Sequence, residues 1–394
     1  MREMKDSGIA WVTTIPNSWN TMANKYIMKK IKRINPVYHD EDILSLTVNG
    51  VIVRDLDAGG KMPTSFDGYQ FLYPGNLLMC LFDYDVTPRC IGLIKNNGVT
   101  SPAYSQFVMN EGFSAAYYYY YYLMVDHTKA ILHLAKNLRH SFTEEQLGMI
   151  SVPVPSLPEQ ESIASFLDGK CAEIGRIATD IQAEIDVLEQ YRQSSITEAI
   201  TRGLSPDAQT KDSGVFYMAP MNAEWRLTKI GYVCTKLARP FVPEDTALIC
   251  SNKGKLLVRP DDMTGIMVSE DNAMQGIHSG DIAIHGMDTW HGAIAMSNLD
   301  GKITRVVHVC DSTEEKRFIV YYLRHLAFQG VYKLISNGVR GNTSDFRSWD
   351  KVKDICIALP RSIQEQKDIC DYLDRLCNEI DGIIAEKQSQ LLAL

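Results

Sequence analysis

The sequence predicts a mixed α/β protein of the α+β class, in which two similar domains are each followed by a long helix. Two observations carry this prediction. Short segments at both ends of the first half recur in the second half at a constant offset, and an amphipathic helical pattern closes each half. A chain of 394 residues is long enough for two domains that each bury a core.

The recurring segments indicate a tandem duplication. Residues 5–8 and 211–214 both read Lys-Asp-Ser-Gly, an offset of 206, and Trp19 matches Trp225 at the same offset. A constant offset at both ends predicts an internal pseudo-twofold repeat instead of one shared short motif. The matches at the far end of each half are Glu159, Gln160, Leu167, Asp168 and Cys171 with Glu365, Gln366, Leu373, Asp374 and Cys377.

Between these ends the two halves agree only loosely. Residues 74–83 align with 279–288 and residues 121–139 with 321–340, but the offset drifts to 205 and then to about 200. The frame is repeated while its contents have diverged. We therefore expect one scaffold that presents two different recognition surfaces.

The closing helices have a coiled-coil character. Apolar residues recur at spacings of three, four and seven over residues 157–202 and 361–394, with charged residues between them. At 1.5 Å per residue they would be about 65 and 45 Å long, too long to bury a seam against one compact domain. We expect two antiparallel coiled-coil helices, the second shortened because the sequence ends at Leu394, which aligns with Leu188.

Short apolar runs between Gly, Pro and Asn predict the strands of each domain. A helix is expected around the Tyr-Tyr-Leu positions of each half, and a last strand leads into each long helix. The strand segments are 42–53, 75–82, 89–94 and 106–109 in the first half and 248–259, 280–287, 292–298 and 303–310 in the second, with last strands at 149–155 and 354–360. The predicted organisation is a first domain (1–156), a first helix (157–202), a linker and second domain (203–360) and a second helix (361–394).

The distribution of charge bears on possible partners. The formal net charge is -8, which by itself argues against nucleic acid, because phosphate contacts need Lys and Arg. The two helical segments carry all of this excess, with nine acids and four bases over 157–202 and seven acids and four bases over 361–394. The rest of the chain is balanced, so a nucleic-acid partner for the domains stays open.

Cysteine and hydropathy patterns are those of an intracellular protein. Nine cysteines are scattered without a Cys-x-x-Cys pair, so we expect reduced, mostly buried thiols and no metal site. No run of 18 apolar residues occurs, and the N-terminus has no signal-peptide pattern. We expect a cytoplasmic protein without a membrane partner.

Three motifs suggest chemistry, and each has a simpler interpretation. Asn-Pro-Val-Tyr at 35–38 is close to an amino-methyltransferase loop, but no Gly-rich cofactor loop precedes it, which favours a turn. Glu-x-Lys at 314–316 and 365–367 could belong to a nuclease, yet both segments stand at predicted helix starts. Six consecutive tyrosines at 117–122 could stack on bases, but their counterpart in the second half is a plain amphipathic helix.

Predicted loops in both halves gather Lys, Arg, Asn, Ser and His, which can contact phosphates or read base edges. Solvated loops have the same composition, so composition alone does not decide between these roles. Trp290, with His285, Asp288 and His291 in a Gly-flanked loop, is the tryptophan most worth testing. The candidate DNA-binding residues are Arg54, Lys61, Arg89, Lys136, Asn137 and Arg139 in the first half, and Lys253, Lys255, Arg259, His285, Asp288, Trp290, His291, Arg340, Asn342 and Ser344 in the second.

Several of these segments together resemble a known family. The sequences at 5–19 (KDSGIAWVTTIPNSW), 156–174 (SLPEQESIASFLDGKCAEI) and 286–294 (GMDTWHGAI), with the repeated Glu-Gln-x-x-Ile helix start, are similar to the specificity (S) subunits of bacterial type I restriction-modification systems. The resemblance covers essentially the whole chain. The second half departs from it, because 301–310 replaces the segment that aligns with 98–109.

The resemblance implies a non-catalytic, sequence-specific DNA-binding subunit. Each variable domain would be a target recognition domain for one half of a bipartite site in double-stranded DNA. The helices would dock two modification (M) subunits that bind S-adenosylmethionine, and restriction (R) subunits would supply a nuclease that uses ATP and Mg²⁺, so this chain itself would need no cofactor. The alternatives are a protein-interaction scaffold and a stand-alone nuclease or methyltransferase. The candidate partner-binding residues are Ile174, Ile177, Ile181, Ile185, Leu188, Ile380 and Ile383.

Overall fold

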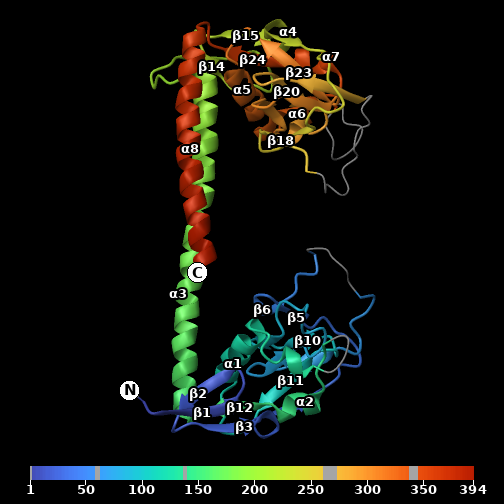
Figure 1. The fold of residues 1–394 in the computed structure, drawn as a ribbon, viewed down its shortest axis with the longest axis vertical. Coiled ribbons are helices and arrows are strands. Elements are labelled where there is room, and N and C mark those ends of the chain that lie inside the picture. Colours follow the sequence, from blue (N-terminus) through green and yellow to red (C-terminus); the bar gives the residue numbers. More distant parts are fainter. Residues whose placement is uncertain (1, 58–62, 136–139, 261–272, 337–344) are drawn as a thin grey trace. The chain divides into compact units, whose positions relative to one another are not determined.

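The computed structural model describes residues 2–57, 63–135, 140–260, 273–336 and 345–394. The chain divides into two compact units, Met1–Arg176 and Ile177–Leu394. The boundary lies within one continuous helix, α3 (Leu157–Arg202), so each unit contains a mixed α/β domain and its own length of helix (Figure 1).

Unit 1 is built on an antiparallel four-stranded sheet with the order β4-β11-β8-β9. Its strands are β4 (Met28–Ile31), β8 (Leu77–Met79), β9 (Ile91–Leu93) and β11 (Ser105–Met109). Four strand pairs surround this sheet: β1 (Met4–Ile9) with β2 (Val12–Pro16), β3 (Asn20–Ala23) with β12 (Ser151–Val154), β5 (Leu44–Thr47) with β6 (Gly50–Val53), and β7 (Gln70–Leu72) with β10 (Gly98–Thr100).

The tyrosine run of unit 1 is a helix that packs into the core. In α1 (Ala115–His127), Ser114 caps the first turn by accepting a hydrogen bond from the Tyr117 amide. Tyr117, Tyr118, Tyr121 and Tyr122 are buried with residues of the sheet, as expected from the helical pattern. The short helices are η1 (Asn24–Tyr26), η2 (Leu132–Leu134) and α2 (Glu144–Met149), the last begun by a capping box of Thr143 and Gln146.

Unit 2 has a sheet with the corresponding order, β16-β23-β20-β21. Its strands are β16 (Cys234–Lys236), β20 (Ile282–His285), β21 (Ile294–Met296) and β23 (Val307–Ser312). The pairs are β13 (Thr210–Lys211) with β14 (Met221–Asn222), β15 (Arg226–Lys229) with β24 (Cys356–Leu359), β17 (Leu248–Cys250) with β18 (Leu256–Val258), and β19 (Met274–Ile277) with β22 (Gly301–Thr304). The helices are α4 (Ile230–Val233), η4 (Thr289–His291), α5 (Lys316–Phe328), α6 (Val331–Ile335) and α7 (Trp349–Lys353).

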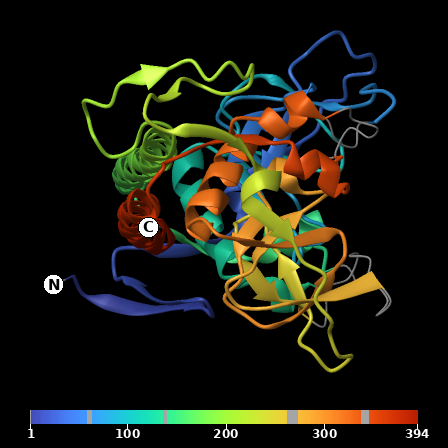
Figure 2. The ribbon, with the colours of Figure 1, turned by 90° about the horizontal axis from the view of Figure 1, so that it is seen from above.

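The C-terminal helix α8 (Ile363–Ala393) lies beside the part of α3 that belongs to unit 2 (Figure 2) and runs antiparallel to it (Figure 1). Ile185 packs against Ile380 and Ile384 in a buried seam. Arg192 donates to Asp381 across the seam at 2.6 Å, and Glu184 pairs with Lys387. These crossed pairs agree with the predicted antiparallel coiled coil.

The predicted strands and helices are present, with shorter strands than the apolar runs suggested. Residues 42–53 and 248–259 each form a hairpin, and the last strands β12 and β24 precede α3 and α8 as expected. Glu315 caps α5 and Glu365 lies in the first turn of α8, which agrees with the helix-start interpretation of both Glu-x-Lys segments. In the described part of the chain, no helix is long and apolar enough to cross a membrane.

Candidate nucleic-acid interface

The repeated Lys-Asp-Ser-Gly segment is a structural turn. The Asp6 carboxylate accepts from the Gly8 amide at 2.8 Å, and Asp212 accepts from Gly214 at 3.0 Å. Both glycines have a positive φ, 70° and 69°, which other L-residues adopt at a cost. The lysine before each turn donates to a backbone carbonyl 12 residues later. The Lys and Asp side chains of both segments therefore bond to the protein's own backbone and stabilise the turn.

The two β-hairpins of the units end at matching arginines. In unit 1 the Arg54 amide donates to the Ile43 carbonyl at 2.8 Å, one step beyond β6. In unit 2 the Arg259 amide donates to the Ala247 carbonyl at 2.8 Å, one step beyond β18. Both arginines are among the predicted DNA-binding residues, and they occupy equivalent positions in the two units.

The tips of these hairpins differ. Thr47 pairs with Gly50, which leaves a two-residue tip, whereas Cys250 pairs with Leu256 and leaves the five-residue tip 251–255. Lys253 and Lys255 on the longer tip are exposed. A cation pair at a hairpin tip is suited to phosphate contact.

Arg324 on α5 holds the longer tip. Its guanidinium lies where a Cβ on Gly254 would be, and it donates to the Gly292 carbonyl at 3.3 Å. Its guanidinium carbon also lies 5.6 Å from the centroid of the Phe328 ring. Burial lowers the pKa of this arginine. The tip and the loop after β20 are thus joined through one side chain that sequence analysis did not select.

The loop after β20 contains the predicted cluster around Trp290. His285 Nδ1 accepts from the Met287 and Asp288 amides at 3.3 and 3.0 Å, and burial lowers the pKa of this imidazole. Trp290 is partly buried against the core of unit 2, and the Lys333 ammonium lies 5.8 Å from its ring centroid. The cluster therefore exists, but His285 and Trp290 support the loop, while His291 is exposed.

Arg89, predicted to contact DNA, makes three hydrogen bonds within the protein. Its guanidinium donates to the Ile91 carbonyl at 3.2 Å, to the Val48 carbonyl at the hairpin tip and to the Tyr119 hydroxyl on α1. These acceptors belong to the protein, which favours a tether for the hairpin over contact with a base. The remaining candidates, Lys61, Lys136, Asn137, Arg139, Arg340, Asn342 and Ser344, lie outside the described residues.

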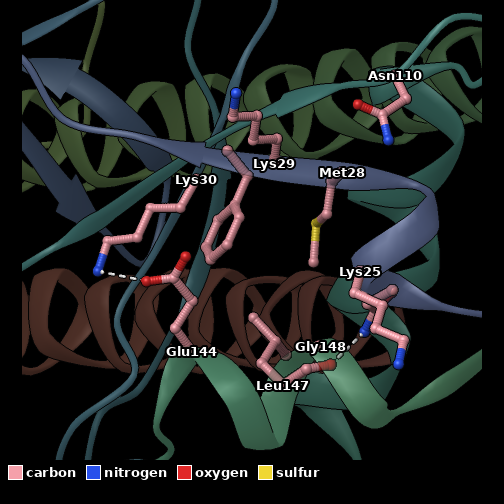
Figure 3. A pocket seen from close by; sticks show the side chains of 10 residues that line it. Lys25, Met28, Lys29, Lys30, Asn110, Glu144, Leu147 and Gly148 are labelled. Atoms are coloured by element: carbon pink, nitrogen blue, oxygen red, sulfur yellow. Dashed lines mark hydrogen bonds and ion pairs between the residues drawn. The ribbon is translucent and has the colours of Figure 1, made fainter.

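A basic segment of unit 1, residues 25–33, includes the edge strand β4 and is absent from the predicted DNA-binding residues. Five cations occur within nine residues, at Lys25, Lys29, Lys30, Lys32 and Arg33. Three of them, Lys25, Lys29 and Lys30, line a cavity of about 270 Å³ beside β4 and α2 (Figure 3). Lys30 pairs with Glu144 at 3.2 Å. β4 is the edge of the sheet opposite β9, so this strand is separate from the hairpin and Arg89. Lysines on an edge strand also prevent pairing with other chains. A count of charges in a ten-residue window finds this segment.

The candidate partner-binding residues divide into two groups. Ile185 and Ile380 are 4% and 3% exposed and pack against each other's helix, with Ile181 and Leu188 beside them. This corrects the assignment of Ile185 and Ile380 to an external partner, because the chain itself buries them, whereas Ile181 and Leu188 are partly buried in the same seam. Ile174, Ile177 and Ile383 are exposed, between 37% and 43%, and remain candidates.

Within the described residues, no group of three or more His, Cys, Asp and Glu side chains is arranged to hold a metal ion. No protein-family model and no curated protein sequence matches the chain. Comparison with solved structures gives a different result. The chain is similar to one from a type I restriction-modification system solved for its complex assembly and conformational transition, with a TM-score of 0.67, 15% identity, and 96% and 95% of the two chains covered. It is also similar to the HsdS subunit from Thermoanaerobacter tengcongensis, with a TM-score of 0.52, 15% identity and 96% of each chain covered.

The chain has the fold of a type I specificity subunit. At 15% identity this similarity concerns the fold, over nearly the whole length of both chains. The specificity-subunit fold agrees with the mixed α/β class and the long helices expected from the sequence.

Proposed function

We propose that this chain is the DNA-recognition subunit of a type I restriction-modification complex and is not itself a catalyst. The observation that carries the proposal is the specificity-subunit fold over 96% of the chain, combined with the sheets of the described residues, five in each unit, which correspond one to one. Residues 1–156 and 203–360 would be two target recognition domains derived from one ancestral domain. Residues 157–202 and 361–394 would be the helices that separate them.

Each domain would read one half of a bipartite site in double-stranded DNA. The hairpin supports this role, because Arg54 and Arg259 hold matching positions while the tips between the strands differ in length and charge. A fixed strand pair with a variable tip is a suitable arrangement for reading different bases on one scaffold. Two domains joined by helices some tens of Å long could reach half-sites about one helical turn of DNA apart.

The acidic helices would face protein and not DNA. Exposed Ile174, Ile177 and Ile383 are apolar positions among acidic neighbours, which suits docking of two modification subunits. S-adenosylmethionine would then bind to those subunits, and ATP and Mg²⁺ to the restriction subunits. Extrusion of the target adenine would also belong to the partners.

The decisive experiment maps methylated adenines in the host genome and then footprints the complex of this chain with its modification subunits. We expect two short protected half-sites separated by a fixed unread gap. Exchange of residues 20–150 for the matching segment of another specificity subunit should change one half-site and leave the other. A single continuous footprint, no footprint, or a change in both half-sites would contradict the proposal.

A further inference from the structure

Both units join their domain to their helix through the same three contacts. We call these sets clamp 1 and clamp 2. Clamp 1 consists of Trp19, Tyr120, Glu159, Gln160 and Asp168, and clamp 2 consists of Trp225, Tyr321, Glu365, Gln366 and Asp374.

The first contact joins a tryptophan to the first turn of the helix. The Trp19 indole N–H donates to the Glu159 carboxylate at 2.9 Å, and Trp225 donates to Glu365 at 2.9 Å. Each tryptophan immediately precedes the strand that pairs with the last strand of its domain. Because the acceptor is charged, each bond is stronger than one between neutral groups.

The second contact is a fully buried glutamine. Gln160 donates to the Pro155 carbonyl at 2.9 Å and accepts from the Ser114 amide at 2.8 Å. Gln366 links the corresponding groups, Pro360 at 3.0 Å and Glu315 at 2.9 Å. The side-chain amide of Gln160 thus joins the start of α3 to the start of α1, and that of Gln366 joins the start of α8 to the start of α5.

The third contact lies farther along each helix. The Tyr120 hydroxyl on α1 donates to Asp168 at 2.6 Å, and the Tyr321 hydroxyl on α5 donates to Asp374 at 2.6 Å. The aspartate is eight or nine residues beyond the first two contacts, which is about 13 Å along a helix. In unit 1, attachments at both places restrict a rotation of the domain about the helix start that the first two contacts alone would permit. In unit 2 the third contact acts together with the packed core and with the bonds of Arg317 to Asp371 and Asp374.

We propose that the two clamps are a positioning device that fixes the angle of each recognition domain on its helix and thereby sets the length of the unread gap between half-sites. This inference rests on the proposed function. A domain of about 150 residues has a radius of roughly 20 Å, so its far surface lies about 40 Å from the helix, and turning the domain by about 5° about its attachment moves that surface by about 3.5 Å. That distance is the rise of about one base pair. The same three contacts occur in both units, although the sequences of the two domains have otherwise diverged. This repetition distinguishes the clamp residues from ordinary packing contacts.

The test uses the complex of the full chain with its modification subunits and DNA probes that carry both half-sites. The gap is kept at its native length or changed by one base pair. In the variant with Tyr120→Phe and Tyr321→Phe, only the two hydroxyls are lost. We expect the preference for the native gap to fall by about tenfold, as the loss of two hydrogen bonds allows, with affinity for a single half-site unchanged. Tyr191→Phe is the matched control, because Tyr191 is an exposed tyrosine on α3 outside both clamps.

A second pair of variants tests whether the gap preference depends on the hydrogen bond from each tryptophan or on the negative charge of the glutamate that accepts it. Glu159→Gln with Glu365→Gln keeps an acceptor for each indole and should keep the gap preference, whereas Glu159→Ala with Glu365→Ala should lose it. If the Phe variant keeps the full gap preference of the wild-type chain, the clamps do not position the domains and the proposed function stands. If it loses affinity for single half-sites, the contacts serve only the fold and the inference is overturned. If the wild-type chain binds neither half-site, the proposed function fails first.

Discussion

The domains of the two units contact their helices to different extents. In unit 1 the core reaches α3 mainly through partly buried Ile163. In unit 2 the core includes residues of two helices, with Ile196 and Ile200 from α3 and Ile369 and Leu373 from α8. The same strand order is thus compatible with one or two helical neighbours, which shows that the frame of the domain does not depend on how much helix covers it.

The largest expected consequence of this difference is acid sensitivity of unit 2. His325 on α5 packs against α3, where Thr197 Oγ1 lies 3.2 Å from its Nδ1, while the equivalent Met124 on α1 is exposed. Burial lowers the pKa of His325 to about 4. Between its ordinary value of 6.5 and that pKa, only the unfolded state binds the proton, so stability is lost as pH falls through this window. The full loss is about 3 kcal/mol.

His325→Met should remove this pH dependence. We expect the variant to show a flatter decline in the free energy of unfolding between pH 6.5 and pH 4, measured by urea denaturation at each pH. His127→Met on α1 is the control and should leave the wild-type slope. An unchanged slope in the His325 variant would mean that another group titrates in that range.

A smaller effect is expected at the longer hairpin tip. Gly254→Ala must adopt a positive φ and displace Arg324, which then loses its bond to Gly292. Gly280→Ala has a similar φ but open space around its Cβ, so it measures the backbone cost alone, about 1 kcal/mol. We expect Gly254→Ala to cost about 2 kcal/mol in thermal unfolding. Equal costs for the two variants would show that Arg324 does not hold the tip.

The smallest expected effect concerns the two exposed lysines on the longer hairpin tip, Lys253 and Lys255. Replacement of Lys253 and Lys255 by alanine should weaken binding to the half-site of unit 2 and reduce the salt dependence of that binding by about two counterions. Replacement of Lys29 and Lys32, equally exposed lysines of unit 1, should leave it unchanged. Fluorescence anisotropy over a range of salt concentrations measures both. If replacement of Lys29 and Lys32 reduces the salt dependence of binding instead, the phosphate contacts lie near β4 and not at the longer hairpin tip.

The sequence predicted what depends on periodicity. Residues 157–202 were expected to form one helix, and α3 spans those residues, because an apolar seam at helical spacing has few other solutions. Strand pairing could not be predicted in the same way. β3 pairs with β12 across more than 120 residues, and no local sequence pattern specifies so distant a partner. Arg89 and Arg324 show the same limit for side chains. Arg89 was predicted to contact DNA, and the structure gives it three acceptors within the protein, which no sequence pattern indicates. Arg324 was not predicted, because its contact depends on the absence of a Cβ at Gly254.

The hairpins have a consequence for how a new DNA specificity could arise. Each second strand is fixed at its end by the arginine amide, at Arg54 or Arg259, whatever the length of the tip. The existing tips of two and five residues show that insertions there leave this anchor in register. Under the proposed function, a single in-frame insertion or exchange at a tip would supply a new reading element for one half-site, while the rest of the domain and both helices are inherited unchanged.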